Sequence, residues 1–308
     1  MKNICYCCGK QLNEENTYWH KKCIKNFFGT NNIPTIDFSS INDELAKQAL
    51  VLLSSKKNIT GVQSKLSLGL SKNKDRLTVV DYPLGYIIKP ETETFIDIAR
   101  AEFLNMLMAK SCHIDTVPNG LIKNKDGSYV YITKRIDRDN GNKIHMEDFC
   151  QLSMLQTERK YSGSYERVGK LIKQYSTHGN KDLSDYFYLL LFNYVSCNSD
   201  MHLKNFSLIE KEDIYLSPFY DLLPVNIIYP KDKEEVALTL NGKKKNITRN
   251  DFIKLGFNIG LNDKVITNLI NEIKKYKDIF IDLINDSLIT KEHKEEYIKE
   301  LTRRMDLL

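Results

Sequence analysis

Residues 198–209 read NSDMHLKNFSLI, and this stretch decides the fold. The run before it, YLLLFNYV at 188–195, is apolar on almost every side, which predicts a buried helix. The residues after it, NFSLI, have the apolar pattern of a strand. The charged and metal-binding types of side chain gather here, with Asp200, His202 and Lys204 between the two runs and Asn205 at the start of the second. We therefore expect a short loop whose position is fixed by core elements at both ends.

Such a loop has the side chains that phosphoryl transfer needs. An Asp can accept the proton of a hydroxyl group, and an Asn a few residues later offers oxygen, the ligand atom that Mg2+ prefers. Asp221, in LSPFYDLLP at 216–224, follows the next expected hairpin and supplies a second, carboxylate ligand. The competing interpretation is a solvated turn, which does not explain the apolar segments on either side. Asp200, Asn205 and Asp221 are thus a candidate base and metal centre.

The chain before residue 140 supplies the remaining parts of an ATP site. The patterns of QSKLSLGL, DRLTVVD and GYIIKP predict three antiparallel strands. Gly61, in NITGVQSKLSL, permits close backbone approach to an anion, although a single Gly is more often only a turn. Lys89 ends a strand, and Glu102 on the helix expected at 95–112 can pair with it, as in protein kinases. A Lys at a strand end is an ordinary surface residue by itself, so the order of these residues carries the prediction.

The order of the expected elements indicates an α+β fold class. Strands, one helix and a further strand, GSYVYITKRIDRD, predict a small β-rich lobe at 31–140. The chain after Met146 is mostly helical in pattern and predicts a larger lobe at 141–308. Residues 1–30 differ from both in being Cys-rich, and we expect them to form a separate small segment.

Seven segments together resemble the HipA family of bacterial toxin Ser/Thr kinases, in the family's order. They are GVQSKLSL, YIIKPE, AEFLNMLMAK, ITKRIDR, HMEDFCQL, NSDMHLKNFSLI and LSPFYDLLP. The DxHxKN loop and the PFYD segment are the most specific of them. The resemblance implies a two-lobed protein-kinase-like (HipA-like) fold that uses ATP and Mg2+, with a small β-rich N-lobe and a larger, mostly helical C-lobe.

The same resemblance implies roles for individual residues. Asp200 is the expected catalytic Asp, and His202 and Lys204 match loop positions that contact the acceptor or the phosphates. Asn205 and Asp221 are the expected Mg2+ ligands, which also belong to the ATP site. The other residues expected at ATP are Thr60, Gly61, Val62, Gln63 and Lys89, with Lys134 and Ile136 beside adenine.

Two departures from the family pattern refine this expectation. Full-length HipA proteins carry about a hundred more residues before the Gly-containing loop, so this chain looks like the short HipT variant, whose missing subdomain is a separate small protein. HipT kinases autophosphorylate within Ser-Ile-Ser-Gly, where this chain has Asn58-Ile59-Thr60-Gly61. The first acceptor position therefore has no hydroxyl group. We expect the acceptor to be one of the nearby hydroxyl residues Thr60, Ser54 and Ser55.

The segment CYCCGKQLNEENTYWHKKC contains four of the seven cysteines. Cys5-x-x-Cys8 followed by His20-x-x-Cys23 has the ligand spacing of a small Zn2+ site. The alternative is a set of small buried side chains beside Trp19, because reduced Cys is among the most buried residue types. Both interpretations stay open on the sequence.

Composition limits the remaining choices. An odd number of cysteines, 7, argues against a secreted disulfide framework, so a cytoplasmic location is expected. The net charge of +5 comes from 45 basic and 40 acidic residues, a nearly balanced mixture that does not indicate bulk nucleic-acid binding. No apolar run approaches the ~20 residues that a membrane-spanning helix needs.

These observations predict an ATP-dependent Ser/Thr protein kinase that autophosphorylates. By resemblance it is the toxin of a toxin–antitoxin system and inhibits translation by phosphorylating an aminoacyl-tRNA synthetase. Its implied partners are a HipS-like small protein and a HipB-like DNA-binding antitoxin, through which any contact with DNA is indirect. The alternatives are a kinase of the same fold delivered as an effector into a host cell, a zinc-dependent DNA-binding regulator, and a catalytically dead binding protein.

Overall fold

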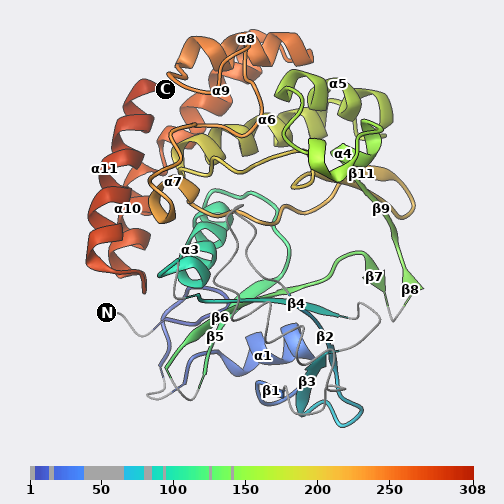
Figure 1. Ribbon diagram of the computed structural model, residues 1–308, viewed down its shortest axis with the longest axis vertical. Coiled ribbons are helices and arrows are strands. Elements are labelled where there is room, and N and C mark those ends of the chain that lie inside the picture. Colours follow the sequence, from blue (N-terminus) through green and yellow to red (C-terminus); the bar gives the residue numbers. More distant parts are fainter. Residues whose placement is uncertain are drawn as a thin grey trace. The chain divides into compact units, whose positions relative to one another are not determined.

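The computed structural model describes residues 4–13, 17–37, 66–79, 85–92, 95–124, 127–139 and 142–308. The chain divides into two compact units (Figure 1). The first comprises Met1–Phe103 and Val117–Lys143, and the second comprises Leu104–Thr116 and Ile144–Leu308. The first unit is built around a β-sheet and the second is mostly helical, which agrees with the expected α+β class.

A six-stranded sheet forms the centre of the first unit, with the strand order β1-β3-β2-β4-β6-β5. All neighbours are antiparallel except β1 and β3, which run parallel, so the three antiparallel strands expected from the sequence are confirmed. A short ribbon of β7 and β8 follows. The strands are β1 (Thr35–Asp37), β2 (Leu66–Leu70), β3 (Arg76–Val79), β4 (Tyr86–Pro90), β5 (Asn119–Lys123), β6 (Tyr129–Lys134), β7 (Arg138–Asp139) and β8 (Asn142–Lys143).

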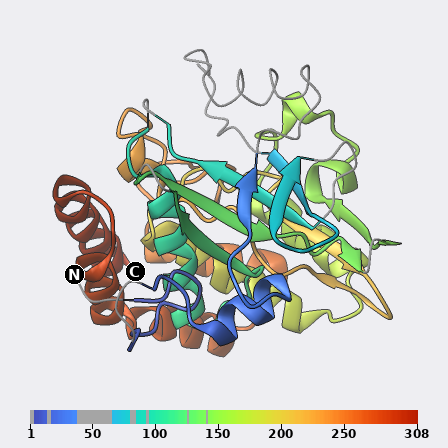
Figure 2. The ribbon, with the colours of Figure 1, turned by 90° about the horizontal axis from the view of Figure 1, so that it is seen from below.

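Helix α1 (Lys21–Phe28) belongs to the same unit (Figure 2). It packs on the sheet through aromatic rings. Phe27 and Phe28 lie with their ring centroids 5.7 and 5.6 Å from that of Tyr86 on β4. The Tyr86 hydroxyl donates to the Phe27 carbonyl at 3.1 Å. The helix ends at Gly29, whose left-handed φ of 71° lets the chain turn away. The N-terminal segment is therefore part of the sheet's apolar core.

Helix α3 (Ile98–Ser111) contains the boundary between the two units. The sequence suggested one apolar stripe, but nearly every side chain of this helix is buried. Its two buried polar residues each have a partner. Glu102 pairs with Lys89, and the Asn105 amide oxygen accepts the hydroxyl of Tyr297. A helix can be buried on all sides when its polar groups are satisfied in this way.

The second unit contains a three-stranded antiparallel sheet in the order β11-β10-β9, and α5 and α6 pack against β11. Helices α10 and α11 lie side by side at the C-terminal end (Figure 1). The elements are β9 (His145–Asp148), α4 (Phe149–Leu152), a 3-10 turn (Thr157–Arg159), α5 (Tyr165–Tyr175), α6 (Asn180–Val195), β10 (Ser207–Glu210), β11 (Ile214–Leu216), α7 (Val225–Ile228), α8 (Arg249–Ile259), α9 (Asp263–Lys274), α10 (Lys277–Asp286) and α11 (Lys291–Leu307).

Helix α6 is the core of this unit, as its apolar run predicted. Leu189, Leu191, Phe192 and Val195 are fully buried. The helices around α6 also pack closely against one another. At Gly169 of α5 an added Cβ would lie 2.4 Å from the side chain of Ile259 on α8. The end of α6 is consequently a rigid support for the loop that follows it.

One boundary differs from the sequence prediction. We expected helix from about Met146 onward, but Glu147 and Asp148 continue β9 and pair with β10. Helix α4 begins only at Phe149 because Asp148 caps it: the Asp148 carboxylate accepts the Gln151 N–H at 2.9 Å, and the Gln151 side chain accepts the Asp148 N–H at 3.0 Å. This capping box sets the helix start where periodicity alone could not.

Candidate active site

The loop after α6 is held by its own hydrogen bonds. The Asn198 side chain donates to Asn193 Oδ1 at 2.9 Å, and Asn198 Oδ1 accepts the Asp200 N–H at 3.2 Å. The His202 N–H donates to the Asp200 carbonyl at 2.8 Å, and the Asn205 N–H donates to the His202 carbonyl at 2.9 Å. The polar residues predicted from the sequence therefore lie on one compact loop between α6 and β10, as expected.

The Asp200 carboxylate accepts a hydrogen bond from a hydroxyl group within the protein. Tyr161 Oη donates to Asp200 Oδ1 at 2.6 Å. Burial raises the pKa of Asp200 from 3.8 to about 6, with Asp221 and Asp232 adding to the rise while Tyr161 and Lys160 oppose it. At neutral pH this carboxylate is thus ionised and more basic than an ordinary Asp.

The His202 ring is buried and neutral. Burial, followed by the charge of Lys160, lowers the pKa of His202 to about 4. Its Nδ1 faces the Lys204 N–H at 3.3 Å, and its ring meets that of Tyr161 edge-on with centroids 5.0 Å apart. A neutral ring in these contacts organises the loop and supports Tyr161.

The Lys204 side chain has a fixed partner on β9. Its Nζ donates to Asp148 Oδ2 at 2.7 Å. Asp148 also caps α4 through its other oxygen, Oδ1. The ion pair therefore joins the loop to the start of a helix that lies 56 residues earlier in the chain.

The expected metal ligands, Asn205 and Asp221, both lie in the second unit near Asp200. Asn205 is buried and its Nδ2 donates to the Asp200 carbonyl at 3.0 Å, which directs that end of the amide inward and leaves Oδ1 as the ligand atom. Asp221 has a left-handed φ of 62°, an uncommon conformation for a residue other than Gly. Asp221 also raises the pKa of Asp200 by its charge. The amide oxygen of Asn205 lies on the same loop as the Asp200 carboxylate, whose charge repels that of Asp221. Oxygen donors of this kind fit Mg2+.

The Asp221 segment is tied to the Asp200 loop by its neighbours. The Tyr220 hydroxyl contacts the Lys204 carbonyl at 3.3 Å and the Ser207 hydroxyl at 2.5 Å. The Phe219 N–H donates to the Asp115 carbonyl at 2.9 Å. The Tyr220 hydroxyl thus holds the Pro218-Phe219-Tyr220-Asp221 segment against the loop and the start of β10, while Phe219 anchors it to the chain at Asp115.

The predicted pairing of Lys89 with Glu102 is confirmed within the first unit. Lys89 Nζ lies 2.7 Å from Glu102 Oε1, and both side chains are at least nine-tenths buried. The ammonium also lies 5.6 Å from the ring centroid of Tyr131 on β6. Burying an ion pair usually costs stability. A buried pair between β4 and α3 therefore indicates a role other than stabilising the fold.

Other predicted residues are exposed or lie outside the described ranges. Lys134 ends β6 with an exposed side chain, and its N–H donates to the Pro118 carbonyl at 2.9 Å. Ile136 follows in the connector and is half-buried. The residues outside the described ranges are Ser54, Ser55, Thr60, Gly61, Val62 and Gln63.

Sequence reasoning missed Tyr161 and Asp148. Tyr161 contacts Asp200 across 39 positions, and Asp148 contacts Lys204 across 56. Tyr161 stands in none of the segments that resemble the family, and Asp148 stands in one of them, HMEDFCQL, without a role that the local pattern assigns to it. Only the folded arrangement of the second unit brings them to the loop.

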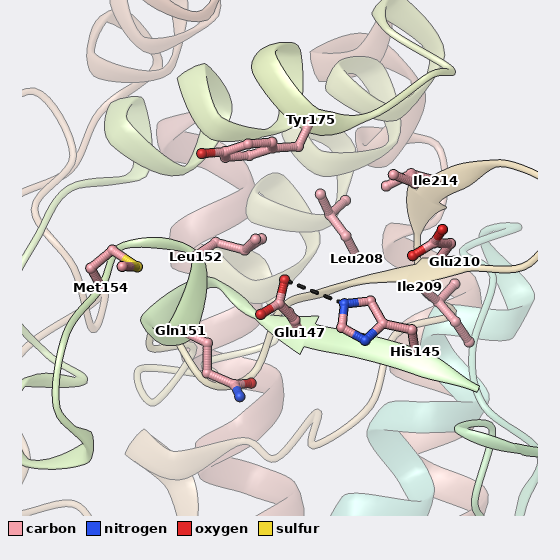
Figure 3. Close-up of a pocket in the computed structure, with 10 residues that line it drawn as sticks. All are labelled: His145, Glu147, Gln151, Leu152, Met154, Tyr175, Leu208, Ile209, Glu210 and Ile214. Atoms are coloured by element: carbon pink, nitrogen blue, oxygen red, sulfur yellow. Dashed lines mark ion pairs between the residues drawn. The ribbon is translucent and has the colours of Figure 1, made fainter. Parts of the chain in front are cut away.

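A pocket of about 250 Å³ also lies in the second unit (Figure 3). His145 and Glu147 line it from β9, opposite Leu208 of β10 and Tyr175 of α5. Because side chains alternate along a strand, His145 and Glu147 face away from Asp148, which contacts Lys204. The pocket is therefore on the other side of β9 from the Asp200 loop and is separate from the candidate site.

The four metal-ligand candidates of the N-terminal segment come together. The ligand atoms of Cys5, Cys8, His20 and Cys23 all lie within 4.8 Å of one another. They belong to the first unit, whereas Asp200 belongs to the second. This cluster is considered separately below.

A family model described as the HipA-like C-terminal domain matches residues 58–280. The chain belongs to this family. The matched region of this HipA-like chain contains Lys89, Glu102, the Asp200 loop and Asp221, and it leaves out the Cys and His cluster.

None of the helices in the described part of the chain is long and apolar enough to cross a membrane.

Curated relatives of this HipA-like chain are named as kinases. A Haemophilus influenzae protein named "Putative kinase" is 27% identical over 282 residues, which cover 82% of this chain and 81% of that protein. Two Sinorhizobium fredii proteins, "Putative kinase Y4mE" and "Putative kinase Y4dM", are each 26% identical, over 73% and 72% of this chain. The match spans only 59% of the length of each rhizobial protein.

Solved structures confirm the two-lobed protein-kinase-like fold. A chain of the Shewanella oneidensis HipA, HipB and operator DNA complex has a TM-score of 0.69 at 20% identity, over 80% of this chain and 64% of that one. The Helicobacter pylori proinflammatory kinase CtkA has a TM-score of 0.55 at 15% identity, over 89% of this chain and 95% of that one. At these identities the likeness concerns the fold.

Proposed function

We propose that this HipA-like chain is an ATP- and Mg2+-dependent protein serine/threonine kinase. The observation that supports it most is the Asp200 carboxylate, which is ionised at neutral pH and accepts a hydroxyl group from Tyr161 at 2.6 Å. The hydroxyl of a Ser or Thr substrate can donate a hydrogen bond of the same kind. A carboxylate in this state is suited to accept the proton of an acceptor hydroxyl during phosphoryl transfer.

The remaining residues have roles that follow from their chemistry. Asn205 and Asp221 would hold Mg2+, which when bound neutralises phosphate charge. Lys89, oriented by Glu102, donates to ATP phosphates, while Lys204 is held by Asp148 and shapes the loop. We assign the backbone amides of residues 60–63 to the ATP phosphates and the chain at 134–136 to adenine. Autophosphorylation would use Thr60, Ser54 or Ser55, placing about two negative charges near these amides and opposing ATP.

Tyr161→Phe is expected to move the acid limb of the pH–activity profile upward. The Tyr161 hydroxyl stabilises the ionised form of Asp200, so its loss raises the pKa of Asp200 further above about 6. We expect the acid limb of the kcat/KM profile to move upward by up to about one pH unit, because a hydrogen bond to a charged group contributes about 1.5 kcal/mol. Kinetics between pH 5 and 8 measure it. Tyr175→Phe on α5 is the matched control, and a Tyr161→Phe profile identical to wild type contradicts the role.

We further propose that the kinase is the toxin of a HipT-type toxin–antitoxin system and acts in the cytoplasm. Its partners would be a HipS-like small protein and a HipB-like DNA-binding antitoxin, and its substrate an aminoacyl-tRNA synthetase whose phosphorylation inhibits translation. Membership of the HipA-like family supports this assignment, as does the likeness to a chain crystallised with HipB and operator DNA.

Phosphoproteomics after brief induction tests both levels of the proposal. Wild-type protein is expected to raise Ser/Thr phosphorylation on itself and on one synthetase, and to arrest growth. Asp221→Ala is expected to abolish all three effects, because it removes a metal ligand. Phosphate transfer that persists in Asp221→Ala contradicts the kinase assignment. Transfer to itself without synthetase phosphorylation or growth arrest contradicts only the toxin assignment.

A further inference from the structure

Three cysteines and one histidine near the N-terminus form a cluster that the kinase assignment does not use. Cys5 and Cys8 lie on a turn between Ile4 and Gln11, which form a β-bridge. His20 is the N-cap of α1, and Cys23 lies in its first turn. The cluster is outside the family match at residues 58–280, so its purpose must be inferred from its own geometry.

The distances in the cluster fit a tetrahedral metal ion. His20 Nδ1 lies 3.4 Å from Cys8 Sγ and 3.8 Å from Cys23 Sγ. In a tetrahedral zinc site with ordinary Zn–S and Zn–N bonds, a sulfur and a nitrogen ligand are about 3.6 Å apart. All four ligand atoms lie within 4.8 Å of one another. One Zn2+ at their centre requires only small side-chain adjustments.

The orientation of His20 is that of a metal ligand. Its Nε2 lies 3.0 Å from the Gln11 carbonyl, which can only accept a hydrogen bond. In the neutral ring Nε2 therefore carries the proton, and the lone pair of Nδ1 points toward the two sulfur atoms. Zinc-bound histidines are commonly fixed in this way, with the second ring nitrogen donating to a backbone carbonyl.

The backbone around the cluster is held in place by its own hydrogen bonds. The Gly9 N–H donates to the Cys5 carbonyl at 2.9 Å, and Gly9 adopts a left-handed φ of 72° that closes the turn. The His20 N–H donates to Cys5 Sγ at 3.3 Å. Cys23 lies in the first turn of α1, which begins directly after its N-cap His20. These features hold the ligand side chains around one common centre.

We propose that Cys5, Cys8, His20 and Cys23 bind one structural Zn2+. Four protein ligands close the coordination sphere, so the site has no open position for catalysis. Cys7 lies between Cys5 and Cys8 in sequence but is not a member of the cluster. The proposal does not depend on the kinase assignment, because no member of the cluster belongs to the Asp200 loop.

The metal would hold the N-terminal segment on the edge strand β5. The Leu121 N–H donates to the Tyr6 carbonyl at 2.8 Å, and Trp19 Nε1 donates to the Leu121 carbonyl at 2.9 Å. Tyr6 follows the ligand Cys5 in the chain, and Trp19 precedes the ligand His20. At Gly120 an added Cβ would lie 2.3 Å from the Trp19 ring, so the indole rests directly on the strand. Zn2+ therefore completes the cover of an otherwise open sheet edge.

Zinc content and the fluorescence of Trp19, the only tryptophan, test the proposal on the full chain. Wild-type protein is expected to contain one zinc per chain and to take up Co2+ with a thiolate charge-transfer absorption band. Cys8→Ser is expected to lose most of the bound metal, and the matched variant Cys7→Ser to keep it. Removing zinc with a strong chelator is expected to shift Trp19 emission to longer wavelength, because the buried indole becomes hydrated.

Several results would overturn the proposal. A purified chain with no zinc and no Co2+ spectrum rules it out, as does a Cys7→Ser variant that loses as much metal as Cys8→Ser. An intact mass showing a disulfide within residues 5–23 after isolation under reducing conditions also overturns it. If Cys8→Ser does not fold, a mercurial titration of wild-type thiols decides, since zinc must be released as the cluster's thiols react. All of these readouts are independent of phosphate transfer.

Discussion

Asp200→Asn is expected to abolish phosphate transfer and, at the same time, to stabilise the protein. The amide cannot accept a proton, so we expect kcat to fall on the order of 10³-fold. The ionised carboxylate of the wild type is partly buried and has a pKa raised from 3.8 to about 6, which means that its charge opposes folding at neutral pH. Removing the charge should raise stability by about 1 to 2 kcal/mol, or several degrees in the melting temperature.

The pH dependence of this gain has a defined sign. A carboxyl whose folded pKa is raised binds its proton more tightly in the folded state, so the wild type loses stability as pH rises from 3.8 through about 6. The advantage of Asp200→Asn is therefore full above about pH 6 and disappears below 3.8. Melting curves at both ends of this range measure it. Asp185→Asn, at an exposed ion pair on α6, is the control and should change little. If Asp200→Asn is less stable than the wild type, the ionised carboxylate does not oppose folding, and the proposed conflict between stability and function at this residue is wrong.

Glu102→Gln is expected to destabilise the first unit strongly and to end catalysis. The substitution leaves the Lys89 ammonium buried beside a neutral amide instead of a carboxylate 2.7 Å away. Breaking one side of a buried pair typically costs 3–5 kcal/mol, roughly, because the other charge is left without compensation. Thermal unfolding and ATP-dependent transfer should both show the loss.

The double variant Lys89→Met with Glu102→Leu separates stability from function. Replacing both charges by apolar side chains of similar size is often neutral or stabilising, so we expect its melting temperature to return close to that of wild type. Phosphate transfer should stay absent, because no ammonium is left for ATP. A double variant that transfers phosphate, or a Glu102→Gln variant as stable as wild type, contradicts the role of the pair.

The sequence predicts those parts of the fold and the site that local pattern determines. The apolar run of α6 and the alternating residues of β2 predicted their elements because burial imposes a period on the sequence. The Asp200 loop and Asp221 were identifiable because each follows an apolar element within a few residues. The pairing of Lys89 with Glu102 required only a strand and the helix that follows it.

What the sequence could not predict depends on contacts between distant segments. The Tyr161 hydroxyl reaches Asp200 only after α5 and α6 have packed, and no local pattern marks that tyrosine. The N-terminal residues Tyr6 and Trp19 bond to Leu121, more than 100 positions later, and nothing in their own spacing indicates which strand they cover. The start of α4 was misplaced because a cap, and not hydrophobic period, determines it.

Asp148 shows how such contacts complicate mutagenesis. One of its oxygens begins a helix and the other holds Lys204, so a single substitution perturbs local folding and the loop together. A screen that scores activity alone would rank Asp148 beside Asp200 and would misread an indirect effect as contact with substrate. Epistasis distinguishes the two: Asp148→Asn keeps an acceptor for the cap, and its defect should depend on whether Lys204 is present, whereas the defect of Asp200→Asn should not.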